Sequence, residues 1–106
     1  MKKNIAILGS TGSIGTQSLD VIRSHPKNFS VEVLTANNNS KLLIRQAKEF
    51  VPNIVVIKNK SKYNEVNNEL CGLGIKVYTG EESLESVVEN ENIDLELKER
   101  RILISE

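Results

Sequence analysis

The sequence has few of the features that mark disulfide-stabilised, metal-stabilised or strongly charged proteins. Its one cysteine, Cys71, cannot form an intrachain disulfide, and no spacing of histidine and cysteine completes a structural zinc site. We expect Cys71 to be a buried or half-buried thiol. The 14 basic and 14 acidic residues cancel, so no net field draws the chain to nucleic acid or to an anionic membrane surface. Nucleic-acid binding is therefore disfavoured.

A long hydrophobic run is also missing. The apolar run at residues 5–8 is far shorter than a signal-peptide core or a membrane span, so we expect no membrane association and a cytoplasmic location. At 106 residues the chain has room for one domain with one core. Its 39% hydrophobic and 26% charged residues are ordinary for a globular protein and too apolar for a disordered one.

Segments typical of strands and of helices alternate along the chain. Apolar or β-branched runs predict strands at residues 4–8, 29–34, 53–57 and 75–78. Helical spacing predicts helices at residues 13–24, 40–50, 61–70 and 80–88. Ser40 and Ser61 are the expected caps of the second and third helices. This order predicts an α/β, Rossmann-like fold with a doubly wound, mainly parallel sheet in a three-layer αβα arrangement.

A glycine-rich turn, Gly9-Ser-Thr-Gly12-Ser-Ile-Gly15, joins the first strand to the first helix. Gly9 lets the chain leave the strand sharply, Gly12 lets backbone approach a pyrophosphate, and Gly15 permits close packing of helix on sheet. The N–H groups and dipole of the helix start favour an anion, and the hydroxyls of Thr11 and Ser13 add donors. A turn without a ligand is the alternative, but the position within a βαβ unit favours dinucleotide binding.

The end of the second strand indicates which dinucleotide is bound. An NAD-binding fold usually carries an acid there for the adenine ribose hydroxyls. After Leu34 this chain has Thr-Ala-Asn-Asn-Asn-Ser-Lys, with no acid and with several groups that can donate to a 2′-phosphate. NADPH is therefore favoured over NADH. The asparagines at 37–39 and Ser40 would equally form a turn and a helix cap. Lys41 and Arg45 would lend charge to the phosphate, although exposed basic pairs are more often only solvated.

The N-terminal stretch resembles one enzyme family. Residues 3–23, with Leu-Asp-Val-Ile-Arg after the glycines, closely resemble the N-terminus of 1-deoxy-D-xylulose 5-phosphate reductoisomerase, an NADPH-dependent oxidoreductase of isoprenoid biosynthesis. The similarity continues through His25-Pro26, Phe29, residues 34–39 and Phe50 with Pro52, and it fades near residues 93–94. Generic Rossmann enzymes share the glycines without the continuation at residues 19–23.

The resemblance implies a set of cofactor-binding residues. By this resemblance, Thr11, Gly12, Ser13 and Ile14 contact the NADPH pyrophosphate and ribose, and Asn37, Asn38 and Asn39 hold the adenosine 2′-phosphate end. The family often carries Gly-Lys-Asn at the last three positions. Asn37 and Asn38 depart from that pattern, which predicts a weaker hold on the 2′-phosphate.

The resemblance also implies a substrate, a metal ion and catalytic residues. The family enzyme is a homodimer that rearranges deoxyxylulose phosphate and reduces it to methylerythritol phosphate, with Mn²⁺, Mg²⁺ or Co²⁺. Its metal ligands and substrate-phosphate donors lie downstream, so we predict no catalytic or metal-binding residue here. Asp94, Glu96 and Glu99 are interpreted as part of a solvated charged stretch. We expect an NADPH-binding domain at 1–95, a divergent tail at 96–106, no catalytic domain, and cofactor binding without turnover.

Several alternatives stay open. The tail either adds a terminal strand at residues 102–104 to the sheet or reflects a truncation or a junction. The chain could instead be a stand-alone nucleotide-binding or interaction module, or the cofactor domain of another NADP-dependent reductase. A short-chain reductase is disfavoured because it normally needs a Tyr-x-x-x-Lys pair, and neither Tyr63 nor Tyr78 has a lysine four residues later.

Overall fold

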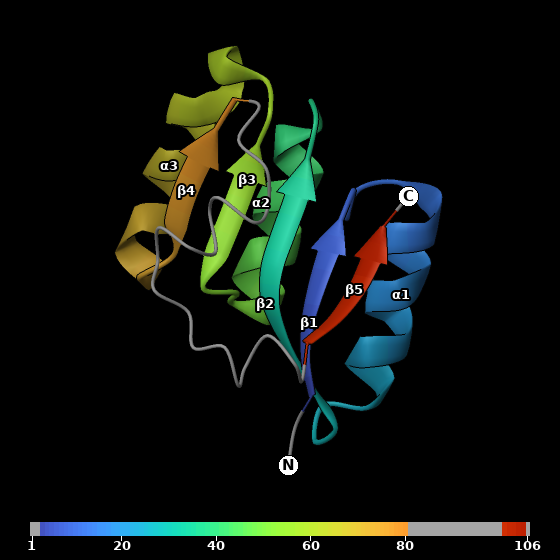
Figure 1. Cartoon of the computed structure of the whole chain (residues 1–106). Coiled ribbons are helices and arrows are strands. Elements are labelled where there is room, and N and C mark those ends of the chain that lie inside the picture. The colour runs from blue at the N-terminus through green and yellow to red at the C-terminus, as the bar shows by residue number, and fades with distance from the viewer. Residues whose placement is uncertain (1–2, 81–100, 106) are drawn as a thin grey trace.

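The chain is an alternating α/β structure in a computed structural model that describes residues 3–80 and 101–105 (Figure 1). The strands are β1 (Lys3–Leu8), β2 (Phe29–Ala36), β3 (Ile54–Ile57), β4 (Lys76–Thr79) and β5 (Arg101–Ser105). The helices are α1 (Ser13–Ser24), α2 (Ser40–Phe50) and α3 (Tyr63–Leu70), with short 3₁₀ turns η1 (Lys60–Lys62) and η2 (Cys71–Leu73). The predicted α/β class is confirmed, and so is the predicted order of elements up to the fourth strand.

The strands form one parallel sheet in the order β4-β3-β2-β1-β5. From β1 the chain proceeds outward to β4 on one side, and β5 then pairs with β1 on the other side. The terminal-strand alternative for the tail is therefore the one observed. Because the direction of winding reverses beside β1, the carboxyl ends of the central strands are the place where such sheets bind ligands.

The three helices cover one face of the sheet (Figure 1). The larger core lies between them and that face, and its fully buried side chains include Ile7, Leu34 and Leu43. The opposite face carries a second buried cluster around Val33 and Val56. A strand buried on both faces suits a parallel sheet. Apart from Gly80, the predicted helix at residues 80–88 lies outside the described residues, so the predicted second helical layer is not tested.

The predicted caps at Ser40 and Ser61 are wrong, because Asn39 caps α2 and α3 begins only at Tyr63, where no side chain caps it. The Asn39 side chain accepts a hydrogen bond from the Leu42 N–H (3.2 Å) at the start of α2. Asn59 likewise accepts the Ser61 N–H (3.0 Å) before η1. Ser40 is the first residue of α2 and is buried, and its hydroxyl donates to Glu65 on α3. That tertiary contact removes Ser40 from capping.

Cys71 is exposed, so its predicted burial is also wrong. It begins η2 directly after α3, beyond the buried face that carries Val66 and Leu70. Its sulfur lies 3.8 Å from the Asn68 carbonyl oxygen, which is a weak contact. In the described part of the chain, no helix is both long and apolar enough to cross a membrane.

Candidate nucleotide-binding site

Gly9 makes the sharp turn after β1 that the sequence predicted. Gly9 has a φ of 79°, a left-handed conformation that disfavours residues with a Cβ. The chain then closes a tight turn in which the Gly12 N–H donates to the Gly9 carbonyl oxygen at 3.1 Å. Gly12 caps α1 with a φ of −82°, which any residue adopts, so its backbone conformation does not require glycine.

Gly15 is required by close packing. A Cβ at this position would lie 2.3 Å from the Gly9 carbonyl oxygen and 2.6 Å from the Ser10 Cα. The first turn of α1 therefore rests directly on the backbone of the glycine turn. The sequence predicted close packing of the helix on the sheet, and the structure places the contact on the turn itself.

Two residues from distant parts of the chain hold the turn. Thr35 at the end of β2 accepts the Gly9 N–H on its side-chain oxygen (3.0 Å) and the Ser10 N–H on its carbonyl oxygen (2.8 Å). Gln46 on α2 accepts the Ser10 hydroxyl (2.7 Å) and donates to the Ser10 carbonyl oxygen (2.8 Å). Ser10, Thr35 and Gln46 are all buried. Because buried polar groups without partners are costly, these bonds fix the position of the turn.

The sequence did not predict Thr35 or Gln46 as supports of the turn. Gln46 carried a usable signal, since it is a polar residue between Leu43 and Ala47 on the face of α2 that packs on the sheet. The bonds themselves join residues 26 and 36 positions apart, a separation that local patterns do not reveal.

Among the described residues, the start of α1 is accessible and has no side-chain cap. No side chain caps it, and no acidic residue stands in its first turn. Thr11 and Gly12 are half-buried, Ser13 is exposed, and the apolar side chain of Ile14 is 51% exposed. The four residues predicted to contact the pyrophosphate and ribose therefore form one accessible corner at the positive end of a helix dipole.

The second predicted group lies at the same edge of the sheet. Asn37, Asn38 and Asn39 are exposed and follow β2 directly, two residues beyond the Thr35 that binds the glycine turn. The carbonyl oxygen of Asn37 and the side-chain oxygen of Asn38 each accept a hydrogen bond of 2.9 Å from Asn59. Asn39 caps α2, so the predicted turn and cap are present. The segment between Thr35 and Ser40 contains no acid that would repel a 2′-phosphate.

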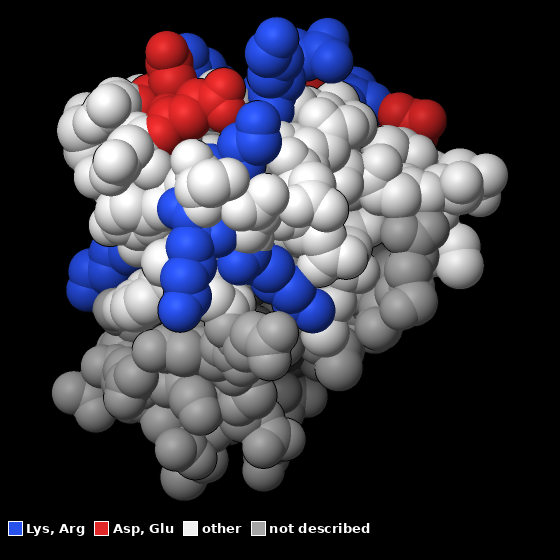
Figure 2. Space-filling model, turned by 90° about the horizontal axis from the view of Figure 1, so that it is seen from above, with Lys and Arg blue, Asp and Glu red and all other residues white. Residues whose placement is uncertain are grey.

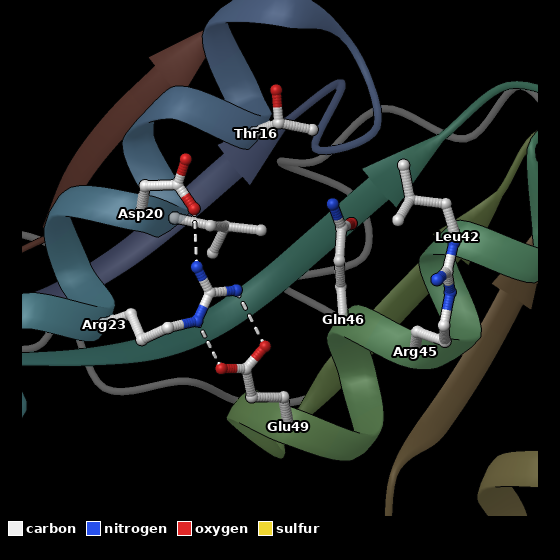
Figure 3. Close-up of a pocket in the computed structure, with 8 residues that line it drawn as sticks. Thr16, Asp20, Arg23, Leu42, Arg45, Gln46 and Glu49 are labelled. Atoms are coloured by element: carbon white, nitrogen blue, oxygen red, sulfur yellow. Dashed lines mark hydrogen bonds and ion pairs between the residues drawn. The ribbon is translucent and has the colours of Figure 1, made fainter.

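A groove of about 300 Å³ between α1 and α2 has a structural role. Figure 3 shows the Arg23 guanidinium between two carboxylates that line this groove, Asp20 and Glu49. Arg23 pairs with both, and its second hydrogen bond to Glu49 measures 2.8 Å. These bonds lower the pKa of Glu49 and raise the pKa of Arg23. Since the acids already neutralise Arg23, its guanidinium is not free for a phosphate, and Arg45 is the other cation that lines the groove.

The described residues contain no group of three or more His, Cys, Asp or Glu side chains that could hold a metal ion. Asp94, Glu96 and Glu99 lie outside the described residues. The accessible groups at the two predicted positions are backbone N–H groups and neutral polar side chains.

Comparison with known proteins agrees with this geometry. The family model described as 1-deoxy-D-xylulose 5-phosphate reductoisomerase matches residues 5–99. The reductoisomerase of Porphyromonas gingivalis is 57% identical over 95 residues, which are 90% of this chain and 25% of that protein. That of Thermoanaerobacter sp. is 44% identical over 86 residues, 81% of this chain and 22% of that protein. The chain thus spans about a quarter of the length of these relatives.

Solved structures of the same enzyme share the fold. The Zymomonas mobilis reductoisomerase in complex with NADPH matches with a TM-score of 0.73 and 34% identity over 83% of this chain and 22% of that one. A reductoisomerase in complex with NADPH, fosmidomycin and magnesium matches with a TM-score of 0.75 and 31% identity, over 87% and 23%. Since the family model covers most of its length, the chain belongs to the 1-deoxy-D-xylulose 5-phosphate reductoisomerase family.

Proposed function

We propose that this chain binds NADPH and forms the cofactor-binding part of a reductoisomerase. One observation carries the proposal: an uncapped, acid-free helix start lies beside an acid-free end of β2, and Thr35 bonds the end of β2 to the glycine turn that leads into the helix. A pyrophosphate suits the first feature because helix N-termini bind anions. A 2′-phosphorylated ribose suits the second because no carboxylate repels it.

The residue assignment follows the two groups at this edge. We assign Thr11, Gly12, Ser13 and Ile14 to the pyrophosphate and ribose, and Asn37, Asn38 and Asn39 to the 2′-phosphate end. The side-chain oxygen of Asn38 already accepts from Asn59, which leaves its amide N–H groups for an anion. NADPH is a hydride donor, and this chain's contribution is to hold it in place.

The reaction of the whole enzyme belongs to the same proposal. It would rearrange deoxyxylulose phosphate and reduce it to methylerythritol phosphate in isoprenoid biosynthesis, as a cytoplasmic homodimer that uses a divalent metal. The solved structures with NADPH and with magnesium support this assignment. We assign no metal ligand or catalytic residue to this chain, so it would bind NADPH without turning over the sugar phosphate.

Calorimetry with NADPH and NADH tests the proposal on the 106-residue chain. We expect NADPH to bind several-fold more tightly than NADH, and no oxidation of NADPH on addition of deoxyxylulose phosphate and Mg²⁺. Equal affinities would contradict the NADPH preference inferred from the acid-free end of β2. Turnover by this chain alone would contradict the proposal that it binds the cofactor without catalysing the reaction.

A pair of serine variants tests the position of the site. Ser13→Ala removes a hydroxyl at the start of α1 and is expected to weaken NADPH binding about three- to tenfold, the usual effect of one lost hydrogen bond. Ser24→Ala is the matched control, because its hydroxyl bonds the Asp20 carbonyl at the other end of the same helix. Equal effects of the two variants would place the cofactor elsewhere.

A further inference from the structure

The ends of β2 and β3 form one structural unit. Ala36 is in register with Ile57, so Asn37 and Lys58 follow on adjacent parallel strands, which lie about 4.8 Å apart. The Lys58 N–H donates to the Ala36 carbonyl oxygen at 2.9 Å. The backbone of Lys58 is therefore fixed beside the segment assigned to the 2′-phosphate.

Asn59 joins the loop after β2 to the loop after β3 by hydrogen bonds. Its N–H donates to the Asn37 carbonyl oxygen and its side-chain amide to the Asn38 side-chain oxygen, both at 2.9 Å. Its own side-chain oxygen accepts the Ser61 N–H (3.0 Å) and the Ser61 hydroxyl (2.7 Å). Both the amide nitrogen and the amide oxygen of Asn59 are hydrogen-bonded, so the backbone of Lys58 is held beside Asn37 and Asn38.

Basic side chains gather at this edge. Figure 2 looks down on the carboxyl ends of the strands and shows several Lys and Arg side chains together there. Lys58 is exposed, and no ion pair or hydrogen bond engages its side chain among the described residues. It is thus available to an anionic ligand.

The other basic residues at this edge are less suitable. The Lys60 Cε lies 3.2 Å from the position that a Cβ on Gly80 would occupy, so its stem runs toward the end of β4 and away from β2. Lys41 and Arg45 line a groove of about 460 Å³ together with Lys48, Glu65 and Glu69, and Arg45 also lines the groove between α1 and α2. Lys48 pairs with Glu69, so Glu65 is the acid that offsets part of the charge of Lys41 and Arg45.

We propose that Lys58 is a specificity residue for NADPH, with its ammonium group facing the 2′-phosphate that residues 37–39 hold. The side chains of those three residues are neutral amides, which can hydrogen-bond either a ribose hydroxyl or a phosphate. An ammonium group attracts the phosphate and gives little to a hydroxyl. Lys58 would therefore supply most of the discrimination between NADPH and NADH, and this inference rests on the proposed function.

The test compares NADPH and NADH affinities of lysine variants by calorimetry. Lys58→Gln is expected to weaken NADPH binding about tenfold and to leave NADH binding unchanged, as expected for the loss of a charged hydrogen bond. Lys58→Arg should retain the preference, because it keeps the charge. Lys27→Gln is the matched control, since Lys27 is exposed in the turn before β2, at the opposite edge of the sheet.

The outcomes separate the inference from the proposed function. If the wild-type chain prefers NADPH and Lys58→Gln keeps the same preference, the role of Lys58 is refuted while the proposed function stands. Equal losses in Lys58→Gln, Lys60→Gln and Lys27→Gln would assign the effect to net charge and would also refute it. If the wild-type chain binds neither cofactor, the proposed function fails and the inference fails with it.

Discussion

The contact between Gly15 and the glycine turn predicts a large effect of a small substitution. In Gly15→Ala the new Cβ would lie 2.3 Å from the Gly9 carbonyl oxygen and 2.6 Å from the Ser10 Cα. Cβ atoms essentially never come within 3.0 Å of another heavy atom, so helix and turn must separate by about 0.7 Å or more. The neighbours are backbone atoms held by Thr35 and Gln46, and they cannot rotate away as a flexible side chain would.

Two opposing effects set the size of the loss. Overpacking of this kind costs about 1–3 kcal/mol. Alanine inside a helix gains up to about 1 kcal/mol over glycine. We therefore expect a net loss of about 1–2 kcal/mol in the free energy of unfolding, which lowers Tm by roughly 4–16 °C for a domain of this size. A displaced turn would also move the N–H groups beyond the usual hydrogen-bond range of about 2.7–3.2 Å, so NADPH affinity should fall about tenfold.

Urea denaturation and NADPH calorimetry measure both effects. Gly72→Ala is the matched control, because nothing lies within 4 Å of a Cβ at that position and its φ is one that other residues adopt. It should leave stability and binding nearly unchanged. If Gly15→Ala proved as stable as Gly72→Ala and bound NADPH with wild-type affinity, the argument that this glycine sets the distance between helix and turn would be refuted.

The fold was predictable because its strands and helices carry distinct periodicities. Short apolar runs ended by glycine or polar residues gave the four predicted strands, and the observed strands overlap all of them. The end of β2 was missed by two residues, since Thr35 and Ala36 stand before three asparagines and resemble the start of a loop. Pairing with Val56 and Ile57 on β3 keeps both residues in the strand. Strand ends thus depend on partners that a local pattern does not contain.

The helix caps also depend on contacts that the local sequence does not contain. Asparagine and serine have similar capping preferences, so the sequence around Asn39 and Ser40 does not decide between them. The choice is made by Glu65, which lies 25 residues away and takes the Ser40 hydroxyl. Long-range contacts therefore decided what the capping preference left open.

The candidate site was predictable where backbone conformation dictates residue type. Gly9 stands at a positive φ and Gly15 at a contact without room for a Cβ, and both were recognisable from their spacing. The partners that hold them were not, because Thr35 and Gln46 come from other elements. The role of Asn59 was likewise hidden, since it depends on the register of β2 with β3.

Two further predictions concern the supports of the site and of the helical layer. Gln46→Ala leaves the buried Ser10 hydroxyl and carbonyl without a partner, so urea denaturation should show a loss of about 1–3 kcal/mol together with weaker NADPH binding. Gln17→Ala, at an exposed position on α1, should change neither. Hydrogen bonds from Arg23 hold the pKa of Glu49 below its ordinary value of 4.5. The stability from this pair should therefore be complete above pH 4.5 and disappear as the pH falls through the lower folded-state pKa, where the carboxylate takes up a proton. Glu49→Gln should accordingly have a lower Tm than the wild type at neutral pH and the same Tm in strong acid. A Tm difference that is independent of pH would mean that the pair contributes through packing and that its charge is unimportant.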